Sequence, residues 1–323
     1  MRRILLIGAG NIGTRHLQGL FGLEEKSEIY VYDTSRLSLE KCKDVFNKSD
    51  ISEKLNVTFS STYSIIPNKI DLAIIATTAN VRRTVIEYLA QTFSIKHFIL
   101  EKVLFQKKED FYAIENLLHR KRIKAWVNCP MRTYPSFIQL KKELRDIKKF
   151  SIEVRGGNWG LCCNAIHFLD LISFLADDAT LKIERADYDD NLLESKRQGF
   201  FELSGSIEGS VGDCTDFCIT EYRDNQMPRM IIVKSKLFNC LIIENEKKIY
   251  KISEKSNWQI EVDHFDIPYQ SQITYQPVNQ IFKTGECNLP TYEQSMKEHI
   301  ELFESMEVQF KKLGIGGGIC PIT

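Results

Sequence analysis

The chain has 323 residues, of which 43% are hydrophobic and 27% charged, a composition typical of a soluble globular protein long enough for two domains. Lys plus Arg and Asp plus Glu number 43 each, so no net charge favours nucleic acid or an anionic membrane surface as a partner. No stretch reaches the roughly 18 apolar residues of a membrane span, and the apolar run after Met1 is too short for a secretion signal. We therefore expect a cytoplasmic protein.

The first 33 residues predict a strand, a glycine turn, a helix and a second strand that ends on a carboxylate. An apolar run at 4–7 leads into Gly8-Ala9-Gly10-Asn11-Ile12-Gly13, and a second run at 28–32 ends at Asp33. Gly8 suits the tight turn, Gly10 leaves room for a pyrophosphate, and Gly13 lets the helix pack close to the strand. The phosphates would lie on the free amides of the helix that starts near Asn11.

The acidic residue bears on the choice of cofactor. Asp33 follows Gly13 by about 20 residues, the spacing at which a carboxylate accepts hydrogen bonds from the adenosine ribose. A carboxylate repels a 2′-phosphate, so Asp33 favours NAD. Arg36, three residues on, is able to pair with such a phosphate, so NADP stays open.

Alternating apolar and amphipathic stretches over residues 1–128 predict a doubly wound parallel sheet, the Rossmann arrangement, with helices on both faces. Strands are expected at 3–7, 28–32, 57–60, 71–76, 97–101 and 123–127, and helices beginning near Asn11, Arg36, Asn80 and Lys108. Ligands of such sheets bind outside the carboxyl ends of the strands. Two of these ends carry polar residues that we expect at the cofactor site: Thr77, Thr78, Asn80, Glu101 and Lys102.

A second, α+β domain is predicted over 129–323, after a crossover bracketed by Pro130 and Pro135. A helix at 134–145, a strand at 149–155 and a helix at 161–176 precede short strands near 181–188, 199–204, 206–211, 215–222, 229–234, 237–243 and 247–251. Strands that follow one another with short turns indicate a large, mostly antiparallel sheet. A helix at 292–312 ends the fold with Gly314 as C-cap, and the glycine-rich tail is interpreted as a flexible terminus.

The nine cysteines include no C-x-x-C pair, which favours reduced and mostly buried thiols over a metal or redox site. We expect no metal.

Two residues of types suited to proton transfer fall at informative positions. Lys102 lies just past the end of a predicted strand, on the side expected for the cofactor. On the helix at 161–176, Cys163, His167 and Asp170 are spaced by four and three residues and share one face. Asp170 would then hydrogen-bond one ring nitrogen of His167 and orient the other toward a substrate. A solvated lysine and a half-buried structural histidine remain the alternatives.

Four elements in this order resemble the family of glucose–fructose oxidoreductase, inositol dehydrogenase and rhizopine catabolism (Gfo/Idh/MocA). They are Gly8 to Gly13 continuing as Thr14-Arg15-His16-Leu17, the pair Glu101-Lys102, Arg132 before Pro135, and His167-Phe168-Leu169-Asp170. The resemblance covers nearly the whole chain, and members are mostly NAD(P)-dependent enzymes acting on sugars, cyclitols or nucleotide-linked forms. It implies that Lys102 contacts the reacting hydroxyl and that His167 contacts the substrate or acts as acid/base.

The chain departs from the family pattern at two positions. Many members have proline after the lysine, where this chain has Val103. A cis bond before a non-proline residue costs about 3 kcal/mol, so we predict a trans bond here and a displaced Lys102. Many members also carry aspartate four residues before the histidine, where this chain has Cys163, and a thiol supplies no permanent carboxylate. Asn164 and Asp170 are the candidates to compensate.

The leading hypothesis is an NAD(P)-dependent oxidoreductase that interconverts a secondary alcohol and a ketone on a sugar or nucleotide sugar. Gly160 to Asp170 and the ending Cys320-Pro321-Ile322-Thr323 resemble a subgroup associated with surface-glycan sugar synthesis. Two other hypotheses stay open. The missing aspartate favours a non-catalytic dinucleotide-binding sensor or scaffold, and relatives of the fold also reduce non-sugar substrates such as an imine or a tetrapyrrole. We expect a homodimer or homotetramer, as is common in the family.

Overall fold

The computed structural model describes residues 1–49, 55–178 and 180–323. The chain divides into two compact units, each considered by itself below. The first comprises Met1–Phe105, Glu109–Asn128 and Pro268–Glu293, and the second comprises Gln106–Lys108, Cys129–Ile267 and Gln294–Thr323. The expected boundary at 128/129 coincides with one crossing between the units, but residues 268–293 return to the first unit.

The first unit is built on a six-stranded parallel sheet in the order β3-β2-β1-β4-β5-β6. This order is that of the doubly wound dinucleotide-binding fold, in which successive strands are added on one side of β1 up to β3 and on the other side from β4 onward. The strands are β1 (Arg2–Ile7), β2 (Ser27–Tyr32), β3 (Leu55–Ser60), β4 (Lys69–Ile75), β5 (Ser94–Leu100) and β6 (Lys124–Val127). The predicted fold class is confirmed.

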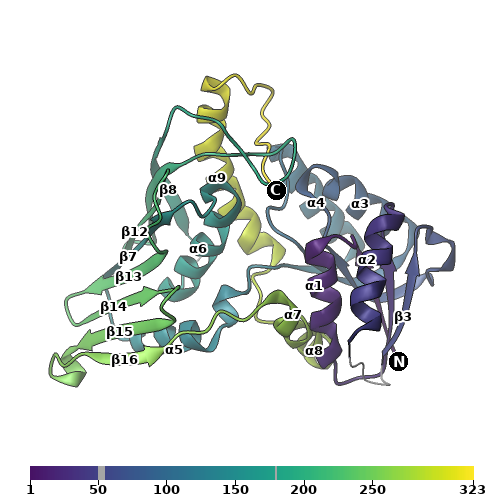
Figure 1. Cartoon of the computed structure of the whole chain (residues 1–323), viewed down its shortest axis with the longest axis horizontal. Helices are drawn as coiled ribbons and strands as arrows, with labels where there is room; N and C mark the ends of the chain where they lie inside the picture. Colours follow the sequence, from purple (N-terminus) through teal and green to yellow (C-terminus); the bar gives the residue numbers. More distant parts are fainter. Residues whose placement is uncertain (50–54, 179) are drawn as a thin grey trace. The chain divides into compact units, whose positions relative to one another are not determined.

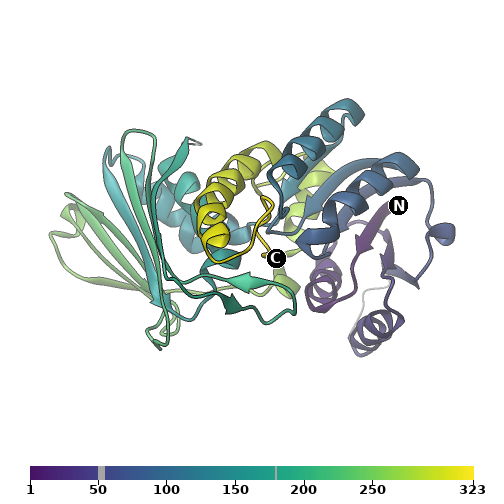
Figure 2. The ribbon, with the colours of Figure 1, turned by 90° about the horizontal axis from the view of Figure 1, so that it is seen from above.

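Four helices cover the two faces of this sheet. They are α1 (Asn11–Gly19), α2 (Arg36–Asn47), α3 (Ala79–Thr92) and α4 (Lys108–Lys121). Within this unit, Figure 2 shows α3 and α4 on one side of the sheet and α1 and α2 on the other. The central strands are buried on both faces, which explains why β1 and β4 consist of unbroken apolar runs at their carboxyl halves.

The returning segment adds two helices to the first unit, α7 (Gln270–Ile273) and α8 (Tyr275–Thr284), which the sequence did not predict. Val278, Ile281 and Phe282 join the same apolar core as Leu17 and Leu20 around α1. The first unit therefore draws part of its core from a segment that lies far along the chain.

The second unit contains an eight-stranded sheet in the order β16-β15-β14-β13-β7-β12-β11-β8. β7 and β12 run parallel, and the other neighbouring pairs run antiparallel. The strands are β7 (Phe150–Gly157), β8 (Leu181–Tyr188), β11 (Gly205–Val211), β12 (Thr215–Tyr222), β13 (Met230–Ser235), β14 (Phe238–Ile243), β15 (Lys248–Ser253) and β16 (Glu261–His264). The predicted mostly antiparallel sheet is confirmed, and the strand expected at 199–204 is reduced to β10 (Phe201–Glu202), which pairs with β9 (Leu193–Glu194).

Three helices lie on one face of this sheet in Figure 1: α5 (Pro135–Leu144), α6 (Leu161–Ala176) and α9 (Tyr292–Lys312). β7 and β12 alternate between buried and more exposed residues, and their buried residues include Ile152, Val154, Phe217 and Ile219. Alternation of this kind is what a sheet with one covered face requires.

The chain after α9 is folded, so the prediction of a flexible terminus is wrong. Gly314 has a φ of +89°, and the amide of Ile315 donates to Phe310, which closes the helix in a Schellman motif as predicted for this glycine. Beyond the glycines, Cys320 and Ile322 are buried. The Cys320 amide donates to the Gln106 carbonyl at 2.9 Å, so apolar burial and backbone pairing hold the tail.

In the described part of the chain, no helix combines the length and apolarity needed to cross a membrane. Six of the nine cysteines are buried, and no disulfide joins cysteines among the residues described.

Candidate functional site

The glycine loop after β1 has the geometry that its sequence predicts. Gly8 has a φ of +98°, and a Cβ at this position would lie 2.8 Å from the Ala76 carbonyl oxygen. A Cβ on Gly13 would lie 1.8 Å from the Gly8 carbonyl oxygen, so only glycine allows α1 to pack this close. A Cβ on Gly10 would meet nothing within 4 Å. The structural roles predicted for Gly8 and Gly13 are confirmed, and Gly10 borders open space.

The N-terminus of α1 fits an anionic group. Gly10 occupies the N-cap without a side-chain hydrogen bond, and the first turn, which begins with Asn11 and Ile12, contains no acidic residue. The first amides of a helix lack intrahelical partners and carry partial positive charge. A pyrophosphate therefore finds donors at this end of α1 and space above Gly10.

The carboxylate of Asp33, which follows β2, hydrogen-bonds the backbone of the glycine loop. One carboxylate oxygen accepts the Ala9 amide at 2.7 Å, and the other accepts the Ser35 amide at 2.8 Å. Each carboxylate oxygen has a further lone pair, so Asp33 retains capacity for ribose hydroxyls. Arg36 is exposed at the first position of α2.

The carboxyl end of β4 carries the second group of predicted cofactor residues. Thr78 is the N-cap of α3, and Asn80 is in its first turn. The hydroxyl of Thr77 is buried and has no hydrogen-bond partner among the described residues. A buried hydroxyl of this kind fits a ligand at this edge of the sheet.

Glu101, which follows β5, is the centre of a buried polar cluster. Its Oε1 accepts hydrogen bonds from His16 Nε2 at 2.8 Å and Asn128 Nδ2 at 2.5 Å. The other ring nitrogen of His16 lies 3.1 Å from the hydroxyl of Thr274, and Gln270 contacts both Asn128 and Thr274. Burial acts to raise the pKa of Glu101, but His16, Asn128 and Lys102 together lower it to about 2. Glu101 is therefore a fixed anion next to Lys102.

The peptide bond between Lys102 and Val103 is cis, so the prediction of a trans bond is wrong. Val103, Leu104 and Phe105 are all buried, and the guanidinium of Arg82 donates to the carbonyls of Val103 and Leu104. The packing and hydrogen bonding of this turn override the local preference for trans.

Arg82 is a residue of the site that sequence reasoning missed. It is 1% exposed and also donates to the Thr77 carbonyl, so one side chain joins the loops after β4 and β5. Its position in α3 could have indicated from the sequence that its side chain is buried. Arg82 lies three residues after Ala79 and four before Ile86, which places it on the buried stripe of the helix.

In the second unit, His167 is half-buried on α6. The start of this helix is held by two carboxylates, because Glu221 accepts the Leu161 amide and Glu202 accepts the Cys162 amide. Cys163 is buried in the first turn, and the side-chain amide of Asn164 donates to the Trp159 carbonyl at 2.8 Å. The side-chain nitrogen of Asn164 therefore stabilises the turn that precedes α6 by a hydrogen bond to its backbone.

Asp170 does not take the place predicted for it beside His167. Its two carboxylate oxygens accept hydrogen bonds from Arg132 at 2.9 and 2.6 Å. Asp170 is fully buried, and burial raises its pKa while Arg132 opposes the rise. The spacing on α6 is as predicted, but the guanidinium of Arg132 satisfies the buried carboxylate better than a neutral imidazole would.

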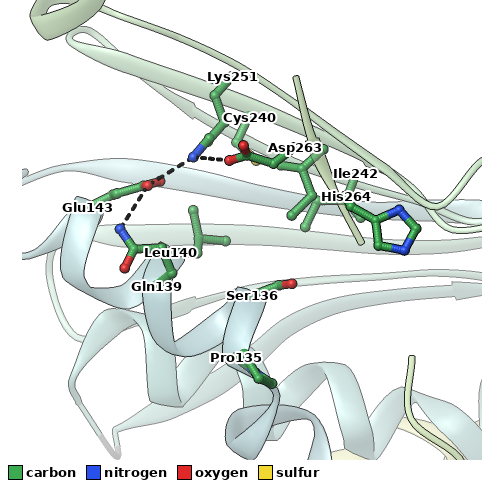
Figure 3. A pocket seen from close by; sticks show the side chains of 11 residues that line it. Pro135, Ser136, Gln139, Leu140, Glu143, Cys240, Ile242, Lys251, Asp263 and His264 are labelled. Atoms are coloured by element: carbon green, nitrogen blue, oxygen red, sulfur yellow. Dashed lines mark hydrogen bonds and ion pairs between the residues drawn. The ribbon is translucent and has the colours of Figure 1, made fainter. Parts of the chain in front are cut away.

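A pocket of about 340 Å³ lies elsewhere in the second unit, between α5 and β14–β16 (Figure 3). Lys251 extends into it and contacts Glu143 at 3.0 Å and Asp263 at 2.6 Å. None of the residues predicted for catalysis or cofactor binding lines this pocket. Among the residues that the structure describes, no group of His, Cys, Asp and Glu is arranged to hold a metal ion.

Comparison with known sequences identifies the glycine loop and its surroundings. Residues 2–129 match the family described as "Oxidoreductase family, NAD-binding Rossmann fold" (Gfo/Idh/MocA). These residues are an NAD-binding domain of the Gfo/Idh/MocA type. The predicted family and cofactor are thus confirmed for this domain. No curated protein matches the chain.

Several solved structures resemble the fold of this chain over nearly its whole length. Levoglucosan dehydrogenase in complex with NADH and levoglucosan is 12% identical with a TM-score of 0.72, over 97% of this chain and 98% of that chain. UDP-N-acetylglucosamine 3-dehydrogenase from Acidithiobacillus ferrooxidans is 12% identical with a TM-score of 0.71, over 94% and 95%. A super-repressor mutant of Gal80p from Saccharomyces cerevisiae is 12% identical with a TM-score of 0.71, over 96% of both chains. At this level of identity the similarity shows the fold.

Proposed function

We propose that this protein is an NAD(H)-dependent oxidoreductase that interconverts a secondary alcohol and a ketone on a sugar or nucleotide sugar. The observation that carries the proposal is the position of Lys102. Lys102 follows the buried anion Glu101 in the sequence, at the carboxyl end of β5. The glycine loop of the same unit fits a dinucleotide. Ligands of parallel sheets bind at this edge.

The residues have distinct roles in the proposed reaction. NAD, held by the glycine loop and Asp33, would supply the hydride acceptor for the carbinol carbon. The amine of Lys102 hydrogen-bonds the substrate oxygen, and His167 of the second unit takes the hydroxyl proton in oxidation and returns it in reduction. His167 is half-buried on α6, and the nitrogens of an imidazole ring can both donate and accept hydrogen bonds.

The substrate class rests on two lines of support. The names of two structural neighbours, levoglucosan dehydrogenase and UDP-N-acetylglucosamine 3-dehydrogenase, refer to carbohydrates. The resemblance of 160–170 and 320–323 to a surface-glycan subgroup favours a nucleotide-linked sugar.

A second function, NAD binding without catalysis, is favoured by one specific residue. Cys163 stands where many members of the family carry aspartate, and neither Asn164 nor Asp170 has a carboxylate available to replace it. One structural neighbour is described as a super-repressor mutant of Gal80p. In this alternative the glycine loop senses NAD and Lys102 has no chemical role.

Turnover of a substrate panel separates these proposals. The protein is incubated with NAD⁺ or NADP⁺ and with levoglucosan, UDP-N-acetylglucosamine, free hexoses or inositol, and the formation of reduced cofactor is followed at 340 nm. We expect turnover with at least one carbohydrate. Lys102→Met should lower kcat about 100-fold or more, because general acid–base groups contribute roughly 10² to 10⁴. Its Kd for NADH should stay within about twofold.

The matched control is Lys69→Met, at an exposed position at the start of β4, which should turn over like the wild type. Full turnover by Lys102→Met would contradict the mechanism. Tight NADH binding without turnover of any substrate would favour the sensor.

A further inference from the structure

Arg82 is a charged residue on the buried stripe of α3, where the helical pattern calls for an apolar side chain. The other buried residues of this helix are small or apolar: Ala79, Ile86, Leu89 and Ala90. Arg82 is as buried as they are. Burial of a cation is costly unless hydrogen bonds compensate for its lost hydration. A residue with this cost at a position that an apolar side chain would fill has a task that its hydrogen bonds should reveal.

The guanidinium of Arg82 donates to backbone carbonyls of two separate loops. Nη2 donates to the carbonyl of Thr77, in the loop after β4. Nη1 donates to the carbonyls of Val103 and Leu104, in the loop after β5, the latter at 2.8 Å. β4 and β5 are neighbours in the parallel sheet, so both loops leave the same edge. The rigid fork of an arginine presents donors in fixed directions and thereby fixes the spacing of the two loops.

Lys102 lies between two anchored stretches of backbone. On one side, the amide of Glu101 donates to the Ile75 carbonyl at 3.0 Å, and the Glu101 carboxylate belongs to the buried polar cluster described above. On the other side, Arg82 holds the carbonyls of residues 103 and 104. The backbone from which Lys102 extends is therefore fixed from both directions, and the hydrogen bonds on the second side come from α3.

We propose that Arg82 is a positioning residue: by joining the carbonyls after Lys102 to the carbonyl of Thr77, it fixes the backbone of Lys102 relative to the loop after β4. The consequence for catalysis rests on the proposed function, whereas the effect on the two loops does not. An apolar residue at this position would complete the buried face of α3 but supply no donor to either loop. Lysine would supply a compact charge without the fork that spans both loops.

The test measures the two loops directly, without substrate or cofactor. Hydrogen–deuterium exchange with mass spectrometry compares the wild type with Arg82→Met and Arg82→Lys. Arg82→Met should raise exchange at residues 77–79 and 103–105 by about tenfold or more, because local opening no longer breaks the hydrogen bonds of the guanidinium. Exchange in β1 and α1 should change less than about twofold. Arg82→Lys should give a smaller rise, confined to the same two loops.

The matched control is Arg83→Met, at the next position of α3. The side chain of Arg83 is 37% exposed and forms ion pairs with Glu87 and Asp110. Its replacement should leave exchange at both loops unchanged. Circular dichroism confirms folding, and Arg82→Lys decides the outcome if Arg82→Met does not fold. Unchanged exchange at residues 103–105 would overturn the proposal. A rise of equal size throughout the first unit, or failure of both variants to fold, would also overturn it, because either result shows a general structural role.

Kinetics with the substrate found in the panel provide a second readout. Both Arg82 variants should lower kcat at least about tenfold, because small displacements of a reacting group are costly in rate. Their Kd for NADH should stay within about fivefold, since Asp33 and the glycine loop hold each other through their own hydrogen bond. A merely structural role would weaken NADH binding and kcat together, and an unchanged kcat would contradict the effect on catalysis. If the wild type turns over no carbohydrate, the proposed function fails, and the exchange result still decides the role of Arg82.

Discussion

Gly8, Gly10 and Gly13 are the same amino acid in three different environments. Gly8 adopts a positive φ that other residues rarely adopt, and Gly13 lets α1 approach the backbone of Gly8 closely. Gly10 borders open space. Position 13 requires glycine even when no ligand is bound, whereas position 10 requires glycine only when a phosphate lies against it. Substitutions at these positions should therefore affect different measurements.

Gly13→Ala should lower the thermal stability of the protein, because its Cβ would overlap the carbonyl of Gly8 and force α1 away from β1. Gly10→Ala should leave Tm within about 2 °C and weaken NADH binding about tenfold or more. Differential scanning fluorimetry and titration of NADH fluorescence measure the two effects. Equal NADH affinity in Gly10→Ala and the wild type would show that the pyrophosphate does not lie at this glycine.

The residues that sequence reasoning found, and those it missed, differ in where their partners lie. Gly13 and Asp33 act on neighbours within one strand–helix–strand unit, so their spacing alone predicts their geometry. His16 and Arg82 act on Glu101 and on the turn at 103–104, which only the folded sheet brings to them. The cis bond before Val103 and the pairing of Asp170 with Arg132 were mispredicted for the same reason.

At the scale of elements, α6 is held by a buried charge cluster that includes α9. Arg132 forms its ion pair with Asp170 on α6, and Glu298 on α9 is the third member, 3% exposed. Burial and the negative charge of Asp170 raise the pKa of Glu298 well above its ordinary value. Arg132 hydrogen-bonds Asp170 and only partly opposes the rise in the pKa of Glu298 through its charge, so we expect Glu298 to keep its proton.

This arrangement predicts how stability depends on pH. Because the folded state keeps the Glu298 proton that the unfolded chain releases, the wild type should lose stability as the pH rises above about 4.5 toward the raised pKa. Glu298→Gln removes this loss. The variant should match the wild type near pH 4.5 and be more stable at pH 8, as measured by Tm at each pH.

Glu304→Gln, at an exposed position on the same helix, is the control and should show no such trend. A difference in Tm between Glu298→Gln and the wild type that stays constant from pH 4.5 to 8 would show that the pKa of Glu298 is not raised.

Long periodic elements and the short strands of the first sheet were predicted well, whereas α7, α8 and β16 were not predicted. The bounds of α6 and α9 agree with those predicted, because their apolar residues recur over several turns. α7 has four residues, and α8 contains a proline in its first turn, so neither has a long pattern. Val278, Ile281 and Phe282 do follow helical spacing, and this was the available signal. β16 is exposed throughout, and its sequence carries no buried face.

For the whole molecule, the return of residues 268–293 determines which parts can fold alone. Val278, Ile281 and Phe282 are buried in the core of the first unit, and the Val127 amide donates to the Pro290 carbonyl at 3.0 Å. Each such side chain contributes about 1.5–3 kcal/mol when buried, and domains are stable by only about 5–15 kcal/mol. Without the segment, most of that margin is lost.

A fragment of residues 1–128 should therefore be largely unfolded and fail to bind NADH. Residues 1–128 joined to 268–293 by a short Gly/Ser linker should fold and bind NADH, since the side chains of Asn128 and Gln270 are already 2.8 Å apart. Circular dichroism and NADH fluorescence distinguish the two fragments. A cooperative thermal transition in the shorter fragment would show that the returning segment is dispensable.

The returning segment also sets the order of events during synthesis. A ribosome adds roughly 5–20 residues per second, so about ten seconds or more separate the emergence of residue 128 from that of residue 293. Throughout this interval, the apolar surface that receives Val278, Ile281 and Phe282 is open to water and to chaperones. The nascent chain therefore acquires its capacity to hold NAD only after residues 268–293 have emerged, although the glycine loop is made well before them.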